Sequence, residues 1–144
     1  MKTFFATLAA AFILVSNSAF AAHEGASARS NVPAINITLN QYTAAVAHGK
    51  VDHLNKLFSE QFNQRYTNGK KNSTFSKEQM LGFLKAHKNI QQQCETDYSI
   101  VDENKGVAVA KVVMRYETGK RVDYVTVAQN ENGYQITQVI TAFE

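Results

Sequence analysis

Cysteine, proline and tryptophan are nearly missing from this chain of 144 residues, which contains one Cys, one Pro and no Trp. A single cysteine excludes an intramolecular disulfide and a zinc site built from cysteines. Hydrophobic residues make up 44% of the sequence and charged residues 19%. This is the composition of a globular protein, so a largely disordered or collagen-like chain is excluded, and the length suits one domain.

Long runs of one charge are also missing. The 15 basic and 12 acidic residues are scattered, and the formal net charge is only +3. Because no cluster of Lys and Arg is long enough to follow a phosphate backbone or heparin, we expect no nucleic-acid partner.

The signatures of several site classes do not occur. The sequence has no glycine-rich phosphate loop, no G-x-S-x-G turn and no Cys/His nucleophile pattern. The spacing of His48 and His53 is not the i, i+4 spacing of a helical metal pair. We therefore expect no cofactor and no metal.

The first residues have the features of a secretory signal peptide. Met1 and Lys2 give a positive start, residues 3–15 are apolar apart from threonines, and Ala19-Phe20-Ala21 fits a cleavage site. The alternative is a membrane anchor, but this apolar run is shorter than the roughly 20 residues that span a bilayer.

These features define the expected domain organisation. We predict a signal peptide at 1–21, a flexible leader at 22–33 and a single domain at 34–144. The product would be periplasmic or secreted. No second apolar stretch approaches membrane length, so we expect no membrane partner after cleavage.

The beginning of the predicted domain has helical periodicity. Four apolar residues share one helical stripe: Ile35, Leu39, Tyr42 and Val46. Gly49 can end this helix in a left-handed conformation. A short second helix is predicted within 51–58, then a strand at 62–67 with a tight turn at Asn68-Gly69.

A third helix and four strands complete the pattern. Ser76 and Gln79 form a capping box at the start of the helix, and Phe75 with Met80 forms a hydrophobic staple. Segments rich in Val, Ile, Thr and Tyr then predict strands near 92–101, 107–117, 120–129 and 134–143. Helices followed by an antiparallel meander indicate an α+β fold, with the helices on one sheet face.

Two glycine turns predict the register of the last strands. Two-residue loops at Thr118-Gly119 and Asn132-Gly133 would place Met114 opposite Asp123 and Val125 opposite Ile140. The face toward the helices would then collect Ala108, Ala110, Val112, Met114, Tyr116, Val125, Val127, Ile136 and Ile140. The other face would collect Lys111, Val113, Arg115, Tyr124, Thr126, Thr137, Val139 and Thr141.

This register places Asp123 and Arg121 on the otherwise apolar face. A carboxylate there needs a partner or a raised pKa. Two interpretations stay open. In one, Asp123 pairs with Arg121 or a tyrosine hydroxyl and has a structural role; in the other, it is a general base.

Several segments resemble the NTF2-like superfamily, and within it the small SnoaL-like, "putative lumazine-binding" branch. The resemblance rests on Tyr42-Thr43-Ala44-Ala45-Val46, His48-Gly49-Lys50-Val51-Asp52, Leu54 to Phe58, Gly106-Val107-Ala108-Val109-Ala110, Val122-Asp123-Tyr124-Val125-Thr126-Val127 and Asn132-Gly133-Tyr134-Gln135-Ile136. It implies a cystatin-like cone in which N-terminal helices pack on a curved antiparallel sheet.

The resemblance also implies a ligand pocket between the concave sheet face and the helices. Its lining would draw on Tyr42, Phe58, Tyr66, Phe83, Tyr98, Met114, Tyr116 and Asp123. The alternative for each aromatic residue is that it fills the core. The hydroxyl groups of several tyrosines need partners or water, which favours a pocket near the open end.

Three functions remain open. The leading hypothesis is an exported domain that binds a small, partly apolar ligand without chemistry. The second is an isomerase, dehydratase or cyclase in which Asp123 is the base and Tyr98 or Tyr116 donates to a developing oxyanion. The third is a homodimeric interaction module. Its outer sheet face would carry Val113, Tyr124, Val139 and Phe143, rimmed by Lys111 and Arg115.

Overall fold

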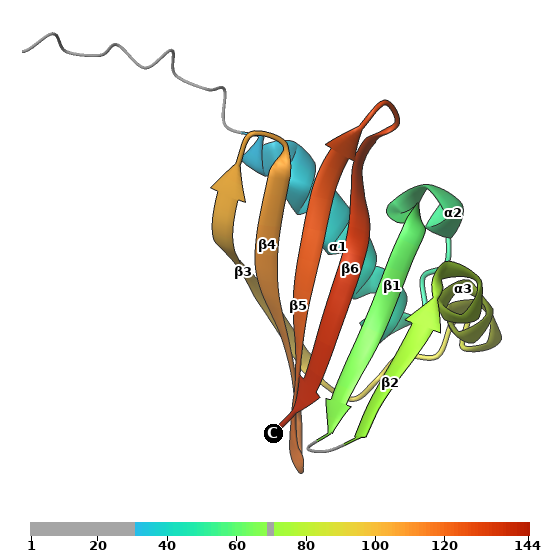
Figure 1. Cartoon of the computed structure of the whole chain (residues 1–144). Coiled ribbons are helices and arrows are strands. Elements are labelled where there is room, and N and C mark those ends of the chain that lie inside the picture. Colours follow the sequence, from blue (N-terminus) through green and yellow to red (C-terminus); the bar gives the residue numbers. More distant parts are fainter. Residues whose placement is uncertain (1–30, 69–70) are drawn as a thin grey trace, which may run out of the picture.

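A single curved sheet with helices on one side forms the molecule (Figure 1). The computed structural model describes residues 31–68 and 71–144, so the predicted signal peptide lies outside the described residues. The elements in chain order are α1 (Val32–His48), α2 (Leu54–Leu57), β1 (Phe58–Asn68), β2 (Lys71–Ser76), α3 (Lys77–Ala86), β3 (Glu95–Asn104), β4 (Val107–Tyr116), β5 (Gly119–Asn130) and β6 (Gly133–Phe143). The predicted α+β architecture is confirmed.

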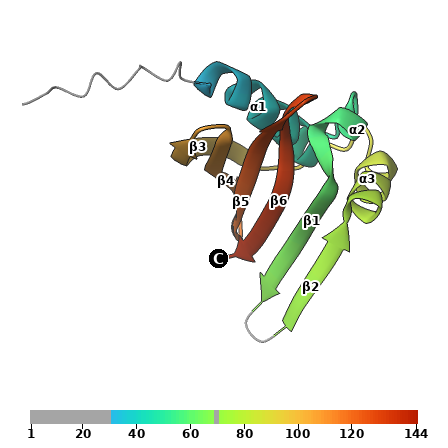
Figure 2. The ribbon, with the colours of Figure 1, turned by 45° about the horizontal axis from the view of Figure 1, so that its top comes forward.

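The strand order is β2-β1-β6-β5-β4-β3. Neighbouring strands are antiparallel except β1 and β6, which run parallel. Figure 2 shows α1 along one face of the sheet and α3 beside β1 and β2. No helix of the described residues lies over the other face of the sheet, which is toward the viewer in Figure 1.

The first helix forms as its apolar stripe predicts. Ile35, Leu39 and Tyr42 are fully buried against the sheet. Gly49 ends the helix with a φ of 62°, and a Cβ there would lie 2.7–2.8 Å from backbone atoms of residues 87, 89 and 90. Glycine is therefore required by both conformation and space. The helix begins at Val32, so its first turn includes residues of the predicted leader.

The third helix has the predicted capping box. Ser76 accepts from the backbone N–H of Gln79 at 3.4 Å, and the Gln79 side chain accepts from the backbone N–H of Ser76 at 2.9 Å. Two backbone donors are satisfied in this way. The helix thus begins directly where β2 ends. Of the tight turn predicted before β2, Gly69 lies outside the described residues, and strand pairing extends to Asn68 and Lys71.

Each of the two hairpin loops lies one residue earlier in the chain than predicted. Tyr116 pairs with Gly119, so the first loop is Glu117-Thr118, and Met114 faces Arg121 rather than Asp123. In the second hairpin Asn130 pairs with Gly133. Gly119 and Gly133 have φ values of 152° and 97°, so each takes its positive φ just after the loop rather than within it. The pairing shifts by two residues, which leaves each side chain on its predicted face near the turns.

A β-bulge in β6 reverses the faces of the side chains further along this strand, relative to the prediction. Val127 pairs with Ile136, but Thr126 pairs with Gln138, so Thr137 is an extra residue. The alternation of side chains reverses beyond it. Ile140 therefore lies on the outer face, and the predicted inner position was wrong.

The same bulge brings three other side chains of β6 to the inner face. Val139 and Thr141 are fully buried there, and Phe143 pairs with the inner-facing Arg121. The predicted outer patch therefore loses Val139 and Phe143 and keeps Val113 and Tyr124.

Candidate functional site

A buried polar network occupies the inner face of the sheet. Asp123 of β5 is fully buried and accepts hydrogen bonds at both carboxylate oxygens. Its Oδ1 accepts from Nε of Arg121 at 2.9 Å and from the hydroxyl of Thr141 at 2.6 Å. Its Oδ2 accepts from the hydroxyl of Tyr42 in α1 at 2.7 Å. The network therefore joins the first helix to two central strands.

The charges within this network are paired. Nη2 of Arg121 lies 2.9 Å from Oδ2 of Asp123 but makes no hydrogen bond there, so the contact is an ion pair. Burial by itself lowers the pKa of Arg121, but Tyr42 and Asp123 outweigh it and raise that pKa above its usual value. Burial and the charge of Asp123 raise the pKa of Tyr42 well above its usual value. Tyr42 therefore stays protonated and donates to the carboxylate.

This geometry favours the structural interpretation of Asp123. A general base needs a free lone pair within reach of a substrate proton. Here both oxygens are occupied by protein donors, and none of the side chain reaches solvent. Removing the carboxylate would leave the guanidinium of Arg121 buried without a counterion.

An apolar cavity of about 580 Å³ lies at the end of the sheet near α3. Strands β1 and β2, helix α3 and the end of β6 supply its walls. The lining residues are Gln64, Tyr66, Ser73, Phe75, Gln79, Met80, Gly82, Phe83 and Phe143. Three of the phenylalanines are unusually accessible for their type: Phe75 is 36%, Phe83 50% and Phe143 60% exposed. Exposed aromatic side chains gathered at one concave place are typical of a binding site.

Aromatic contacts give this cavity its shape. The rings of Tyr66 and Phe143 are stacked, with centroids 6.1 Å apart and planes inclined by 10°. Phe75 meets the ring of Tyr66 edge-on at 5.4 Å. The cavity is therefore bounded by a flat aromatic surface to which a planar ligand could stack.

The cavity and the polar network touch through two side chains. Gln64 lines the cavity and donates from Nε2 to the hydroxyl of Thr141 at 3.0 Å. Thr141 in turn donates to Asp123. Cζ of Arg121 lies 5.9 Å from the centroid of the Tyr66 ring, a cation–π distance. The buried network thus holds this part of the cavity wall in place.

The structure separates the predicted pocket residues into three groups. Tyr66 and Phe83 line the cavity. Tyr42, Phe58, Met114 and Asp123 are fully buried in the interior. Tyr98 and Tyr116 are half-buried and pack against the core. The hydroxyl of Tyr116 donates to Oε1 of Gln92 and lies 3.8 Å from Sδ of Met114, so it is already engaged.

Sequence reasoning missed several residues that line the cavity. Phe75 and Met80 were recognised only as a helix staple, although a staple at the edge of a sheet can also form a wall. Gln64 lies two residues from both Phe62 and Tyr66 in β1, so the three side chains share one face. This period of two could have shown that Gln64 points inward. Phe143 could not be placed without the bulge at Thr137.

Residues 31–68 and 71–144 contain neither a metal-binding cluster nor a helix that could span a membrane. No group of three or more His, Cys, Asp and Glu side chains is arranged to hold a metal ion in this part of the chain. No helix in the same residues is long and apolar enough to cross a membrane.

The sequence matches a protein-family model described as "Putative lumazine-binding" over residues 30–140. None of the curated proteins matches the chain. Solved structures similar to the chain include NTF2-like proteins of unknown function.

Three of these solved structures illustrate the likeness. The protein from Silicibacter pomeroyi has a TM-score of 0.67 and 14% identity, covering 79% of this chain and 96% of its own. That from Shewanella baltica has a TM-score of 0.63 and 14% identity, covering 79% and 94%. That from Methylobacillus flagellatus has a TM-score of 0.63 and 16% identity, covering 79% and 92%. At these identities the likeness shows the fold alone.

Proposed function

Because the chain belongs to the "Putative lumazine-binding" family of NTF2-like proteins, we propose that it binds a small, partly apolar ligand in the cavity beside α3, without catalysing a reaction. One observation carries this proposal: the exposed rings of Phe75, Phe83 and Phe143 surround a single cavity together with Tyr66. A volume of about 580 Å³ is within the range of small-molecule sites.

The lining favours a flat, mostly apolar molecule with a few polar edges. The stacked pair of Tyr66 and Phe143 offers aromatic surface, while Gln64, Gln79 and Ser73 offer hydrogen-bond donors and acceptors. No charged side chain is among the lining residues that the structure describes, so a neutral ligand is favoured. Flavin-like, pterin-like and steroid-like compounds have these properties.

The proposal of binding without chemistry is supported by the state of Asp123. Its oxygens are engaged by Tyr42, Arg121 and Thr141, and it is fully buried. An enzyme that used this carboxylate as a base would first have to break these contacts. If a reaction is found, Asp123→Asn with retained folding and retained turnover would discard the Asp123 mechanism.

Gly82 provides the sharpest test of the binding site. It lines the cavity, and a Cβ added there meets no atom within 4 Å. Gly82→Trp should therefore fill the cavity without disturbing the core, and Gly82→Ala is the matched control. Riboflavin, 6,7-dimethyl-8-ribityllumazine, a pterin and a steroid are screened by the shift in melting temperature.

We expect at least one of these compounds to raise the melting temperature of the native protein and of Gly82→Ala, but not of Gly82→Trp. A ligand at a hundred times its Kd stabilises a protein by about 2.7 kcal/mol, which is readily measured. The proposal fails if no compound shifts the native protein and native mass spectrometry from its own host shows no bound molecule. It also fails if Gly82→Trp binds as well as Gly82→Ala.

Export is a separate part of the proposal. It is supported by the positive start, the apolar run and the Ala19-Phe20-Ala21 cleavage pattern of the sequence. The intact mass of the protein recovered from its own host measures the cleavage. A chain beginning at Ala22 is expected, and a chain that retains residues 1–21 would contradict export by this route.

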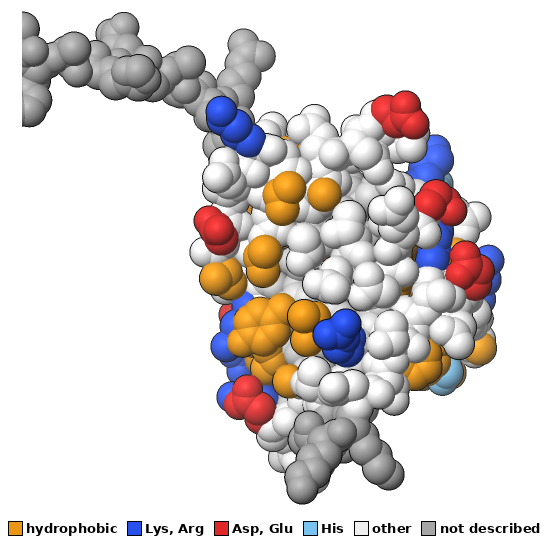
Figure 3. All heavy atoms as spheres, in the orientation of Figure 1, with side chains coloured by type: hydrophobic (Ala, Val, Ile, Leu, Met, Phe, Trp, Pro, Cys, Tyr) orange, Lys and Arg blue, Asp and Glu red, His pale blue; other side chains and the backbone are white. Residues whose placement is uncertain are grey.

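A homodimer through the outer sheet face is a second, independent proposal. Tyr124 is 42% exposed there, opposite Lys111 on one side and Ile140 on the other. Figure 3 shows hydrophobic side chains gathered over β4 and β5 on this face. Sedimentation of the native protein and of Tyr124→Ser measures the association. A monomer at high concentration would refute it.

A further inference from the structure

A second cavity, of about 880 Å³, lies on the sheet face away from α1. It forms where β1 and β6 stop pairing. Phe58 pairs with Ile136 and Asn63 with Gln138, so residues 59–62 face Thr137 alone. The hairpin between β5 and β6 bounds one side of the cavity, and α2 with the start of β1 bounds the other (Figure 1).

Side-chain amides dominate this cavity. Its lining includes Asn55, Gln61, Asn63, Gln129, Asn130, Asn132, Gln135 and Gln138. No aromatic side chain is among its lining residues within the described chain. In Figure 3 the face over β6 is accordingly mostly white, the colour of uncharged polar side chains and of the backbone. The cavity beside α3 has the opposite character, so the two are chemically distinct.

Hydrogen bonds among these amides fix the floor of the cavity. Nε2 of Gln135 donates to the backbone oxygen of Lys56 at 2.8 Å, and its Oε1 accepts from Nδ2 of Asn130 at 2.5 Å. Nε2 of Gln138 donates to Oδ1 of Asn63 at 3.2 Å. The contact between Gln138 and Asn63 leaves further donor and acceptor capacity on both of these amides. The floor is thus pre-organised but not saturated.

The hydroxyl group of Ser59 is a second feature of this cavity, independent of the amides. This residue of β1 is 9% exposed and lines the cavity, and its Oγ is buried without any hydrogen-bond partner in the described structure. Buried hydroxyl groups normally have a partner, because an unpartnered one loses its hydration without compensation. The Ser59 hydroxyl is therefore an unsatisfied group in the cavity wall, which a ligand can pair with once the side chain rotates toward the cavity.

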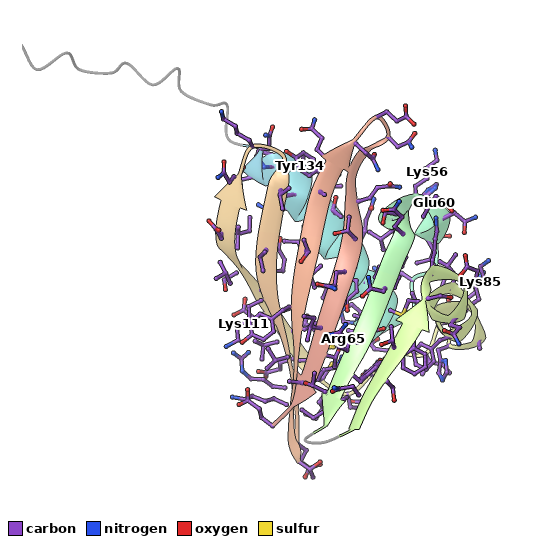
Figure 4. All side chains as sticks on the ribbon, in the orientation of Figure 1. Lys56, Glu60, Arg65, Lys85, Lys111 and Tyr134 are labelled. Carbon is purple, nitrogen blue, oxygen red and sulfur yellow. The ribbon has the colours of Figure 1, made fainter. Side chains whose placement is uncertain are left out.

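The charges near the cavity are few and mostly compensated. Glu60 pairs with Nζ of Lys77 at 2.6 Å, which leaves Lys56 and Glu131 as one charge of each sign. Figure 4 shows Lys56 and Glu60 together near α2 and the start of β1, at one side of the cavity. A strongly charged ligand would find no net counter-charge here.

We propose that this cavity binds a carbohydrate. Amide groups both donate and accept, which suits arrays of sugar hydroxyls, and the near-neutral lining suits an uncharged sugar. A nucleobase or other flat ring would favour an aromatic surface to stack on, and no aromatic side chain lines this cavity within the described residues. The site lies in a different cavity from the one in the proposed function and does not depend on it.

The proposal is tested by titrating the full folded protein with maltotetraose, cellotetraose and chitotetraose, followed by NMR of backbone and side-chain amides. We expect one of them to bind and to shift signals of Ser59, Gln61 and Gln138. Ser59→Ala and Gln61→Ala should each weaken binding about tenfold, the loss of one good hydrogen bond. Gln91→Ala, an exposed glutamine outside the cavity, is the matched control and should bind like the native protein.

Folding does not obscure this test. Ser59→Ala removes a hydroxyl that has no partner, and Gln61 is exposed, so neither change should lower the melting temperature. The proposal is overturned if none of the three sugars binds at millimolar concentration, or if both variants bind as tightly as Gln91→Ala. It is also overturned if the shifted signals surround Tyr66, which would place the sugar in the other cavity. Gly82→Trp should leave sugar binding unchanged, so the two sites can fail separately.

Discussion

The hydroxyl of Tyr42 and the carboxylate of Asp123 are joined by a hydrogen bond of 2.7 Å across 81 residues of sequence. The bond attaches the middle of α1 to the central strand β5, and both side chains are fully buried. Arg121 and Thr141 bind the same carboxylate. Stability and the shape of the neighbouring cavity therefore depend on one small polar group inside an apolar core.

Asp123→Asn is expected to destabilise the protein strongly. The amide keeps the size of the side chain but leaves the buried guanidinium of Arg121 without its counterion, at a cost of about 3–5 kcal/mol. Urea unfolding measures the loss. Asp97→Asn, on the exposed side of edge strand β3, is the control and should change stability little. Equal unfolding midpoints for the two variants would contradict a structural role for Asp123.

The stabilising contribution of Tyr42 should be lost at alkaline pH. Burial and Asp123 raise the pKa of Tyr42 in the folded state. An unfolded tyrosine loses its proton near pH 10, so above that pH the folded state binds more protons than the unfolded state. The stabilisation is complete below about pH 10 and is lost as pH rises toward the higher pKa of the folded state, by up to about 1.4 kcal/mol per pH unit.

Unfolding free energies measured between about pH 9 and pH 11 test this sign. Tyr42→Phe should be less stable at neutral pH, by about 1.5–3 kcal/mol for a hydrogen bond to a charged group, and should show a shallower alkaline decline. Some decline should remain, because burial also raises the pKa of Tyr116. Tyr124→Phe changes an exposed tyrosine and is the control. Identical slopes for Tyr42→Phe and the native protein would refute the assignment.

Local patterns were sufficient to predict most of the fold. The stripe from Ile35 to Val46, the capping box at Ser76 and the Val-rich late strands each depend on neighbours in sequence, and each forms as expected. The burial of Asp123 with Arg121 was also predictable, because near the turns the faces depend only on alternation along β5. The bulge at Thr137 has no such local signature, so the far end of β6 was assigned to the wrong face.

The candidate site was predictable only in part for a related reason. Tyr66 and Phe83, which line the cavity, were expected at a pocket because the resemblance to the NTF2-like superfamily implies one between the sheet and the helices. Aromatic character does not distinguish them from Tyr42 or Phe58, which fill the core. That distinction depends on how closely α1 approaches the sheet. The periodicity of a sequence does not predict such distances between elements.

The bulge leads to a prediction about the relative stability of variants at two adjacent residues of β6. Val139 is fully buried, whereas Ile140 lies on the outer face and is only half-buried. Val139→Ala should cost about 1.5–3 kcal/mol, from lost apolar burial and the cavity left behind. Ile140→Ala removes more atoms but should cost less. Urea unfolding measures the loss of stability in both variants. A larger loss for Ile140→Ala than for Val139→Ala would contradict the bulge and favour the register predicted without it.

Glycines 82 and 49 should respond to alanine in opposite directions. Gly82 is inside α3, where a Cβ meets nothing within 4 Å, so Gly82→Ala should stabilise the protein by about 1 kcal/mol through helix propensity. Gly49 has a φ of 62°, and its Cβ would clash with backbone atoms at 2.7–2.8 Å. Gly49→Ala should therefore destabilise it by at least about 1–2 kcal/mol, the cost of the left-handed conformation alone. Thermal unfolding compares them, and a destabilising Gly82→Ala would mean that α3 needs flexibility where it borders the ligand cavity.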